Sequence, residues 1–124
     1  MLGMQEQASI WFADVLRDGS PMEQVVARAA LLALGDKGQR TQLRAFGTHS
    51  DPEVRKAVAE LDAQDTDLLA ALLADGVAAV RMAAARSLAE LGDKRAVSVL
   101  REALGRGGAD AVAAYAQLVK LHQQ

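Results

Sequence analysis

Six basic and hydroxyl side chains recur at matched positions 57 residues apart, and their chemistry suits a charged or polar partner. Each pair keeps its chemical type, and the three pairs are Lys37 with Lys94, Thr41 with Ser98, and Arg44 with Arg101. Ammonium and guanidinium groups form strong hydrogen bonds with carboxylates, and hydroxyls both donate and accept. We therefore expect two matching polar faces that bind an acidic or polar partner, or that simply keep their helices soluble.

The middle of the chain interrupts this basic pattern. The equivalent helix carries Asp65, Asp67 and Asp75 with no basic residue, and Leu73 occupies one of its exposed sites. A protein that tracks a phosphate backbone needs continuous positive charge, and the net charge of this chain is −2. The pattern favours a protein partner over nucleic acid, with Leu73 as an apolar anchor between two basic ends.

Residues that could support catalysis or metal binding are few. His49 and His122 have no second histidine at metal-ligand spacing, and neither is followed by glutamate. Cysteine is absent, which excludes thiolate catalysis, disulfides and cysteine-type zinc sites. The glycine-rich stretch at 105–108 lacks the preceding strand and the lysine of a phosphate-binding loop. The sequence therefore predicts a protein that is not an enzyme and that holds no cofactor or metal.

Helices must position these side chains, and a repeated turn marks where the helices end. Leucine, glycine and aspartate follow one another at 34–36 and again at 91–93. Glycine adopts the left-handed conformation that ends a helix, and aspartate accepts hydrogen bonds from the free N–H groups of the next helix. Ser20 and Asp51 each precede a first-turn proline, which is another helix start. The pattern predicts helices at 4–17, 22–34, 37–46, 52–61, 67–74, 77–91, 94–104 and 109–122.

Composition limits the class of protein. Alanine carries much of the apolar content, aromatic residues make up 3%, and only two prolines interrupt the chain, as expected for closely packed helices. The first twenty residues lack a basic start followed by an apolar run, and no stretch approaches the roughly 20 apolar residues of a membrane span. We expect an all-α protein of one domain, 1–124, located in the cytoplasm.

Residues 80–100 resemble a known repeat family. Their pattern comprises Val80, Arg81, Ala84, Ala85, Ser87, Leu88, the turn at 91–93, Arg95, Ala96, Val97 and Leu100. It is similar to the short HEAT-like repeat found in phycobilisome lyases and many bacterial scaffold proteins. An earlier copy around 27–36 keeps the turn but lacks the Val-Arg pair, and a middle copy keeps Val54 and Arg55 but lacks the turn.

The resemblance implies a right-handed α-solenoid of about three HEAT-like helix pairs, at 21–47, 51–75 and 77–105. A capping helix at 1–19 precedes the pairs, and an unpaired helix at 109–122 follows them. In such stacks the second helix of each pair lines the concave face. The binding candidates are therefore Lys37, Thr41, Arg44, Leu73, Lys94, Ser98 and Arg101.

The resemblance also implies a function and a role for two arginines. In the family such arginines commonly face an aspartate of a neighbouring repeat, which assigns Arg55 and Arg81 to ties between repeats. The implied function is a non-catalytic scaffold or adaptor that binds a protein on the concave face. Two alternatives stay open: an accessory subunit or chaperone of a cofactor enzyme, as for bilin lyases, and a less favoured HEAT-like nucleic-acid binder.

The terminal helices carry aromatic residues that either shield the stack or contact a partner. Trp11 and Phe12 are adjacent, so one can cover the first pair while the other stays exposed. The apolar stripe of the first helix comprises Met4, Ala8, Trp11 and Val15. Tyr115 has the same two possible roles on the last helix, whose outer face is less polar than a good cap requires because it carries Ala113, Ala116 and Val119. We therefore also expect self-association through the terminal helices.

Overall fold

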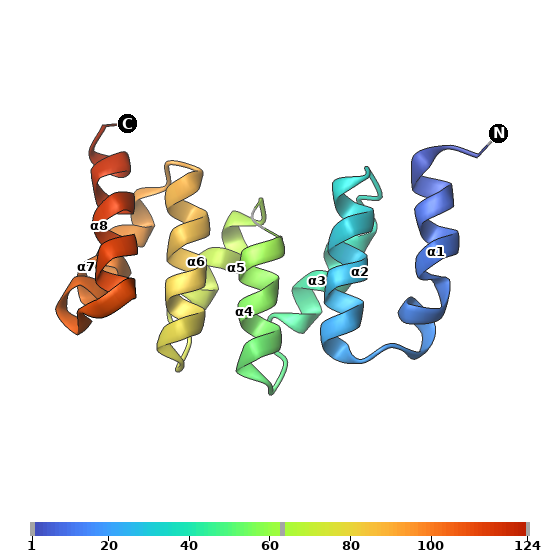
Figure 1. The fold of residues 1–124 in the computed structure, drawn as a ribbon, viewed down its shortest axis with the longest axis horizontal. Coiled ribbons are helices and arrows are strands. Elements are labelled where there is room, and N and C mark those ends of the chain that lie inside the picture. Colours follow the sequence, from blue (N-terminus) through green and yellow to red (C-terminus); the bar gives the residue numbers. More distant parts are fainter. Residues whose placement is uncertain (1, 63, 124) are drawn as a thin grey trace. The chain divides into compact units, whose positions relative to one another are not determined.

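The computed structural model describes residues 2–62 and 64–123, and every regular element in these two ranges is a helix (Figure 1). The elements are α1 (Met4–Asp18), α2 (Pro21–Ala33), α3 (Gln39–Phe46), α4 (Pro52–Leu61), α5 (Thr66–Leu72), α6 (Ala78–Glu90), the 3₁₀ helix η1 (Lys94–Ala96), α7 (Val97–Arg106) and α8 (Gly108–His122). The predicted all-α class is confirmed, and the helix ends lie close to those predicted.

Side-chain caps explain where three of these helices begin. Ser20 accepts a hydrogen bond from the Glu23 N–H, and the Glu23 carboxylate accepts one from the Ser20 N–H, which completes a capping box before α2. The Asp51 carboxylate accepts from the Glu53 N–H at 2.9 Å and caps α4. Asp65 caps α5 in the same way. The predicted starts at these positions are confirmed.

The repeated turn has the same backbone geometry in both copies. Gly35 and Gly92 have φ angles of 107° and 76°, in the left-handed region that side chains other than glycine rarely adopt. In each copy the N–H of the following aspartate donates to the carbonyl five residues earlier, at 3.0 Å after α2 and 2.9 Å after α6. Each glycine N–H donates to the carbonyl three residues earlier, which completes a Schellman motif.

The two aspartates of this turn have different roles. The Asp93 carboxylate accepts from the Arg95 N–H at 3.0 Å and starts η1, as predicted. The prediction that Asp36 caps the next helix is wrong. The α3 helix begins only at Gln39, and its first turn has no side-chain cap. The Asp36 carboxylate instead accepts a hydrogen bond from the Gln39 side-chain amide at 3.0 Å.

Almost all of the glycine-rich stretch at 105–108 lies within helices. Gly105 and Arg106 belong to α7, and Gly108 is the first residue of α8. Only Gly107 lies between the two helices, and both Gly107 and Gly108 have φ near +70° (74° and 68°). These left-handed residues reverse the chain within one step, so α7 and α8 form a tight hairpin.

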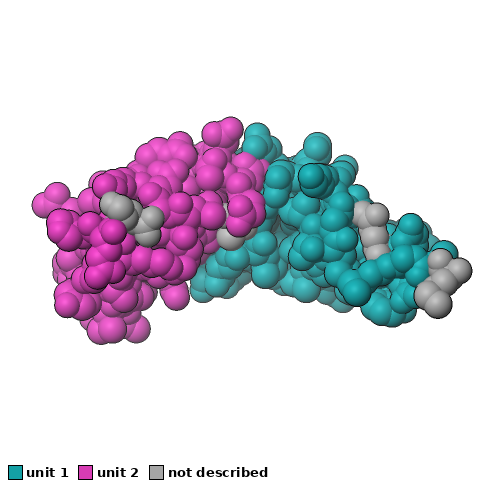
Figure 2. Space-filling model, turned by 90° about the horizontal axis from the view of Figure 1, so that it is seen from above, with its two compact units in different colours: residues 1–62 teal, residues 63–124 magenta. Residues whose placement is uncertain are grey.

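The chain groups into two compact units, residues 1–62 and residues 63–124 (Figure 2). The boundary falls between α4 and α5, so the predicted middle pair at 51–75 contributes one helix to each unit. The single domain expected across 1–124 stays a prediction.

The core of the first unit lies between α2, α3 and α4, which all contact one another. Val25, Leu31, Leu43 and Val58 are fully buried in this core. Burial of each such side chain stabilises a fold by about 1.5–3 kcal/mol. Leu43 anchors α3 from one side, and Thr41 and Arg44 of the same helix are exposed.

The α1 helix packs on α2 through a different stripe from the one predicted. Ala8 is fully buried and Phe12 and Val15 are half-buried, whereas Met4 and Trp11 are 66% and 69% exposed. The contact with α2 is therefore centred between Ala8 and Phe12, which leaves Met4 and Trp11 at its edge. Of the two adjacent aromatic residues, Phe12 is half-buried and Trp11 is exposed, in agreement with the expectation that only one of them covers the first pair.

The second unit is built around α6, because α5, α7 and α8 all contact this helix. Eight of its thirteen residues are buried, including three consecutive alanines at 83–85. Side chains this small let neighbouring helices approach on several sides and still fill the space between them. Leu100 of α7 is fully buried, but Leu104, four residues further along, is 42% exposed in the last turn of the helix.

Candidate interaction surface

Three of the predicted binding residues lie close together in the second unit. Lys94 belongs to η1, and Ser98 and Arg101 belong to the first half of α7. All three are exposed, and their spacing of four and three residues places them on one side of the helix. Fully buried Leu100 holds α7 against the core, so these three side chains form a continuous polar strip, which we call the α7 strip.

The corresponding residues of the first unit are also exposed. Lys37 lies in the turn before α3, and Thr41 and Arg44 lie on α3 itself. Leu73, the apolar anchor predicted for the middle pair, ends α5 in the second unit and is half-buried. Three of the predicted residues thus lie in the first unit, and the other four, Leu73 and the α7 strip, lie in the second. Their role in binding stays a prediction.

Most basic residues of the second unit are held by carboxylates. Arg95 binds Asp93 through Nη2 at 2.6 Å, and this hydrogen bond is the main cause that lowers the pKa of Asp93. Lys120 of α8 pairs with Glu90 of α6, and the Gln117 amide donates to the same carboxylate at 2.9 Å. The Lys120 contact is the main cause of the lowered pKa of Glu90.

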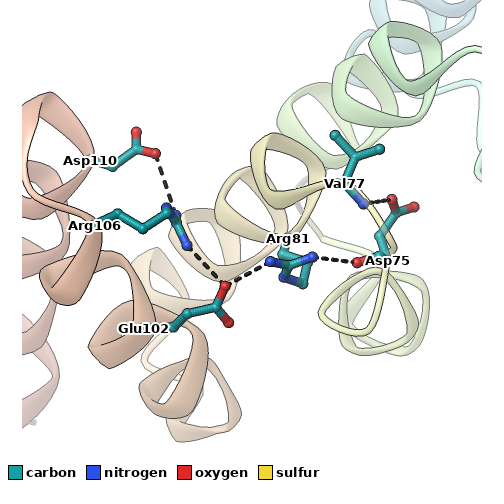
Figure 3. A network of polar contacts seen from close by, with 6 residues as sticks. All are labelled: Asp75, Val77, Arg81, Glu102, Arg106 and Asp110. Carbon is teal, nitrogen blue, oxygen red and sulfur yellow. Dashed lines mark hydrogen bonds and ion pairs between the residues drawn. The ribbon is translucent and has the colours of Figure 1, made fainter.

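A second network joins three helices through one carboxylate oxygen (Figure 3). Arg81 of α6 donates to Oε1 of Glu102 on α7 at 2.7 Å, and Arg106 donates to the same oxygen at 2.9 Å. Arg106 also reaches Asp110 of α8 at 3.4 Å. The hydrogen bond from Arg81 is the largest cause that lowers the pKa of Glu102. These side chains point toward one another and are occupied with holding the helices together.

The Val-Arg pair has the same local role in both copies. Arg81 donates to the Asp75 carbonyl at 2.8 Å, and Arg55 donates to the His49 carbonyl at 2.8 Å. Each arginine therefore closes the loop that precedes its own helix, across an interval of six residues. The predicted tie between repeats takes a different form for Arg81. This side chain donates to the backbone of the loop after α5, and its carboxylate partner Glu102 on α7 belongs to the same predicted pair at 77–105.

Lys94 and Arg101 differ from these paired cations. Neither forms an ion pair within the part of the chain that the structure describes. Arg86 of α6 shares this property and is exposed, but it lies outside the α7 strip. A cation without an internal partner keeps its full capacity to bind an external carboxylate. The α7 strip therefore combines exposure, free positive charge and a rigid helical support.

A recess lies beside the α7 strip, between the start of α7 and the end of α8. Its volume is about 240 Å³, and it is lined by Lys94, Val97, Leu118, Leu121 and His122. The predicted helix at 109–122 contains Leu118, Leu121 and His122, but its pattern does not show what they contact. Only the tight hairpin at Gly107 brings the end of α8 back to the start of α7, so no local pattern reveals this recess.

Residues 2–62 and 64–123 contain neither a metal-ligand cluster nor a membrane-spanning helix. No group of three or more histidine, aspartate or glutamate side chains is arranged to hold a metal ion in these ranges. Across the same residues, no helix combines the length and the apolar character that crossing a membrane requires.

Comparison with known proteins identifies the second half of the chain. Residues 61–119 match a family model described as HEAT repeats. No curated protein and no solved structure matches the chain. The matched range contains α5, α6, η1, α7 and most of α8, whose helix pairs and repeated turn agree with a repeat of this type. The HEAT-like resemblance inferred from residues 80–100 is confirmed by this match over residues 61–119, and the phycobilisome-lyase type stays a prediction.

Proposed function

We propose that this protein is a non-catalytic scaffold or adaptor that binds an acidic segment of a protein partner on the α7 strip. HEAT repeats commonly mediate protein interactions, which supports this class of function. The observation that carries the proposal is the state of Lys94 and Arg101, which are exposed and lack ion pairs within the described residues. Complementary charge accelerates association and selects partners of opposite charge.

The proposal also includes the first unit and the type of solenoid that the helices form. Lys37, Thr41 and Arg44 repeat the chemistry of the α7 strip, and we assign them to the same partner. Leu73 contributes an apolar contact. This arrangement requires a right-handed solenoid of about three helix pairs, whose second helices line a concave face, and we place its action in the cytoplasm.

A charge-reversal experiment tests the proposal. The double variant Lys94→Glu and Arg101→Glu replaces two free cations with anions, so we expect its capture of partners from a lysate of the native host to fall at least about tenfold. Arg86→Glu is the matched control, because Arg86 is equally exposed but lies on α6. Quantitative mass spectrometry compares the proteins captured by the three forms. Equal capture by all three would contradict the proposal.

The same purified protein separates the alternative functions. An accessory subunit of a cofactor enzyme should copurify with a coloured group, visible in the absorbance spectrum. A nucleic-acid binder should retain labelled DNA at low salt and release it as salt rises, because its affinity comes from displaced counterions. Either result would replace the scaffold proposal with the corresponding alternative.

A further inference from the structure

The recess beside the α7 strip combines two chemistries within a small space. Val97, Leu118 and Leu121 line it with apolar side chains, and the lining is completed by Lys94 and His122, whose side chains end in nitrogen donors. Lys94 carries a positive charge without an ion pair in the described part of the chain, and a neutral imidazole still offers one N–H. A ligand that fits must therefore bring an apolar group and an anion together.

The size of the recess limits that ligand. Pockets for cofactors and drug-sized molecules have volumes of about 300–1,000 Å³, whereas this recess has about 240 Å³. It suits a group the size of one amino-acid residue. The apolar group and the anion must then belong to the same residue of the ligand.

The C-terminal residue of a polypeptide meets this requirement. It carries a side chain and a carboxylate on the same Cα atom. An internal acidic residue next to an apolar one does not, because successive side chains of an extended peptide point to opposite sides. The acidic groups nearest in sequence to Lys94 are already engaged, since Asp93 binds Arg95 and Glu90 binds Lys120. The positive charge of Lys94 itself therefore remains available for a ligand.

We propose that this recess binds the C-terminal residue of a partner protein, with an apolar side chain against Val97, Leu118 and Leu121 and the terminal carboxylate on Lys94. His122 donates a second hydrogen bond to the same carboxylate. Arg101 lies one helical turn beyond Val97 and binds an acidic side chain further back in the partner. This inference rests on the proposed function, because it names the part of the partner that the α7 strip binds.

Nuclear magnetic resonance of the full chain tests the inference with defined probes. The probe is the acetylated tetrapeptide Asp-Glu-Asp-Leu with a free carboxylate, titrated to 10 mM, on the order of the weakest affinities expected for one short contact. We expect amide shifts confined to residues 94–101 and 117–123. The same peptide with a C-terminal amide should bind at least about tenfold more weakly, because it loses the charge-assisted hydrogen bonds.

Matched variants localise the effect. Lys94→Gln should weaken binding of the free acid at least about tenfold, to the level of the amide peptide. Arg86→Gln, which changes an exposed cation of α6 outside the α7 strip, should leave the affinity unchanged. Both positions are exposed, so neither substitution should disturb the packing of the core.

Equal binding of acid and amide peptides, or no shifts at the highest concentration, would overturn the inference. That failure is distinguishable from failure of the proposed function. The double charge reversal at Lys94 and Arg101 would still abolish partner capture if the α7 strip binds an internal acidic segment. If that reversal leaves capture unchanged, the proposed function itself fails.

Discussion

Two helices of equal length, α2 and α6, end in the same turn but have very different surroundings. Three of the thirteen residues of α2 are buried, against eight of the thirteen in α6. Both end in a left-handed glycine with the same backbone hydrogen bonds. The turn is thus set by local sequence, whereas burial is set by the neighbours that each helix contacts. The family match covers α6 and leaves out α2.

Substitution of one core leucine in each helix should show the largest difference. Leu31 and Leu88 are both fully buried and occupy the same place before the repeated turn. We expect Leu88→Ala to lower the free energy of unfolding by about 4 kcal/mol and Leu31→Ala by about 3 kcal/mol, within the range for leucine cavities. The difference follows from denser packing around α6, where the cavity collapses less. Urea unfolding measures both, and a larger loss for Leu31→Ala would break the comparison.

Substitutions at a second matched position of α2 and α6 should change stability by an intermediate amount. Val26 of α2 is 51% exposed, whereas Ala83 of α6, at the equivalent position, is 6% exposed. Ala83→Val adds two methyl groups to a closely packed site and should cost about 1–3 kcal/mol. Val26→Ala should change stability by less than about 0.5 kcal/mol, as expected for a surface position. Thermal unfolding distinguishes the two, and equal shifts in Tm would show that α6 is not packed more tightly.

The glycines of the repeated turn should instead behave alike. Gly35→Ala and Gly92→Ala each force a Cβ into the left-handed region, which costs about 1–2 kcal/mol. No atom lies within 4 Å of a Cβ placed on Gly35, so strain in the backbone is the only cost there. The two variants should therefore lose similar stability in urea. A loss confined to one of them would show that the turns are not equivalent.

The smallest effect concerns the response to acid. The pKa of Glu102 is lowered from its ordinary value of 4.5 by the hydrogen bond from Arg81. Because the folded-state pKa is the lower one, this carboxylate stabilises the fold above about pH 4.5 and loses its contribution as the pH falls further. The Tm of the wild type should fall more between pH 6 and pH 3 than that of Glu102→Gln. Identical pH profiles of Tm would show that the Glu102 network does not contribute to stability.

The sequence was informative wherever local chemistry decides structure. The helix class, the caps at Ser20 and Asp51 and the turns at Gly35 and Gly92 follow from hydrogen bonds within a few residues. These features could be predicted because their partners are close in the chain. Asp36 shows the limit, since the delayed start of α3 takes its carboxylate away from the free N–H groups.

The parts that could not be predicted depend on contacts between distant residues. The buried stripe of α1 does not include Trp11, because the position of α2, and not the helix pattern, determines which face of α1 is buried. The recess beside the α7 strip depends on the hairpin that returns His122 to Lys94. The exposure of the α7 strip could be predicted from residue spacing. The absence of ion pairs at Lys94 and Arg101 among the described residues could be seen only from the positions of the surrounding carboxylates.

The most direct test of the account is the amount of partner captured by Lys94→Glu with Arg101→Glu, relative to that captured by Arg86→Glu. We predict a ratio below about one tenth, because reversed charges repel an acidic segment while the control leaves the α7 strip intact. Circular dichroism establishes that both variants keep the helical content of the wild type. A ratio near one, with both variants folded, would contradict the assignment of the α7 strip as the binding surface.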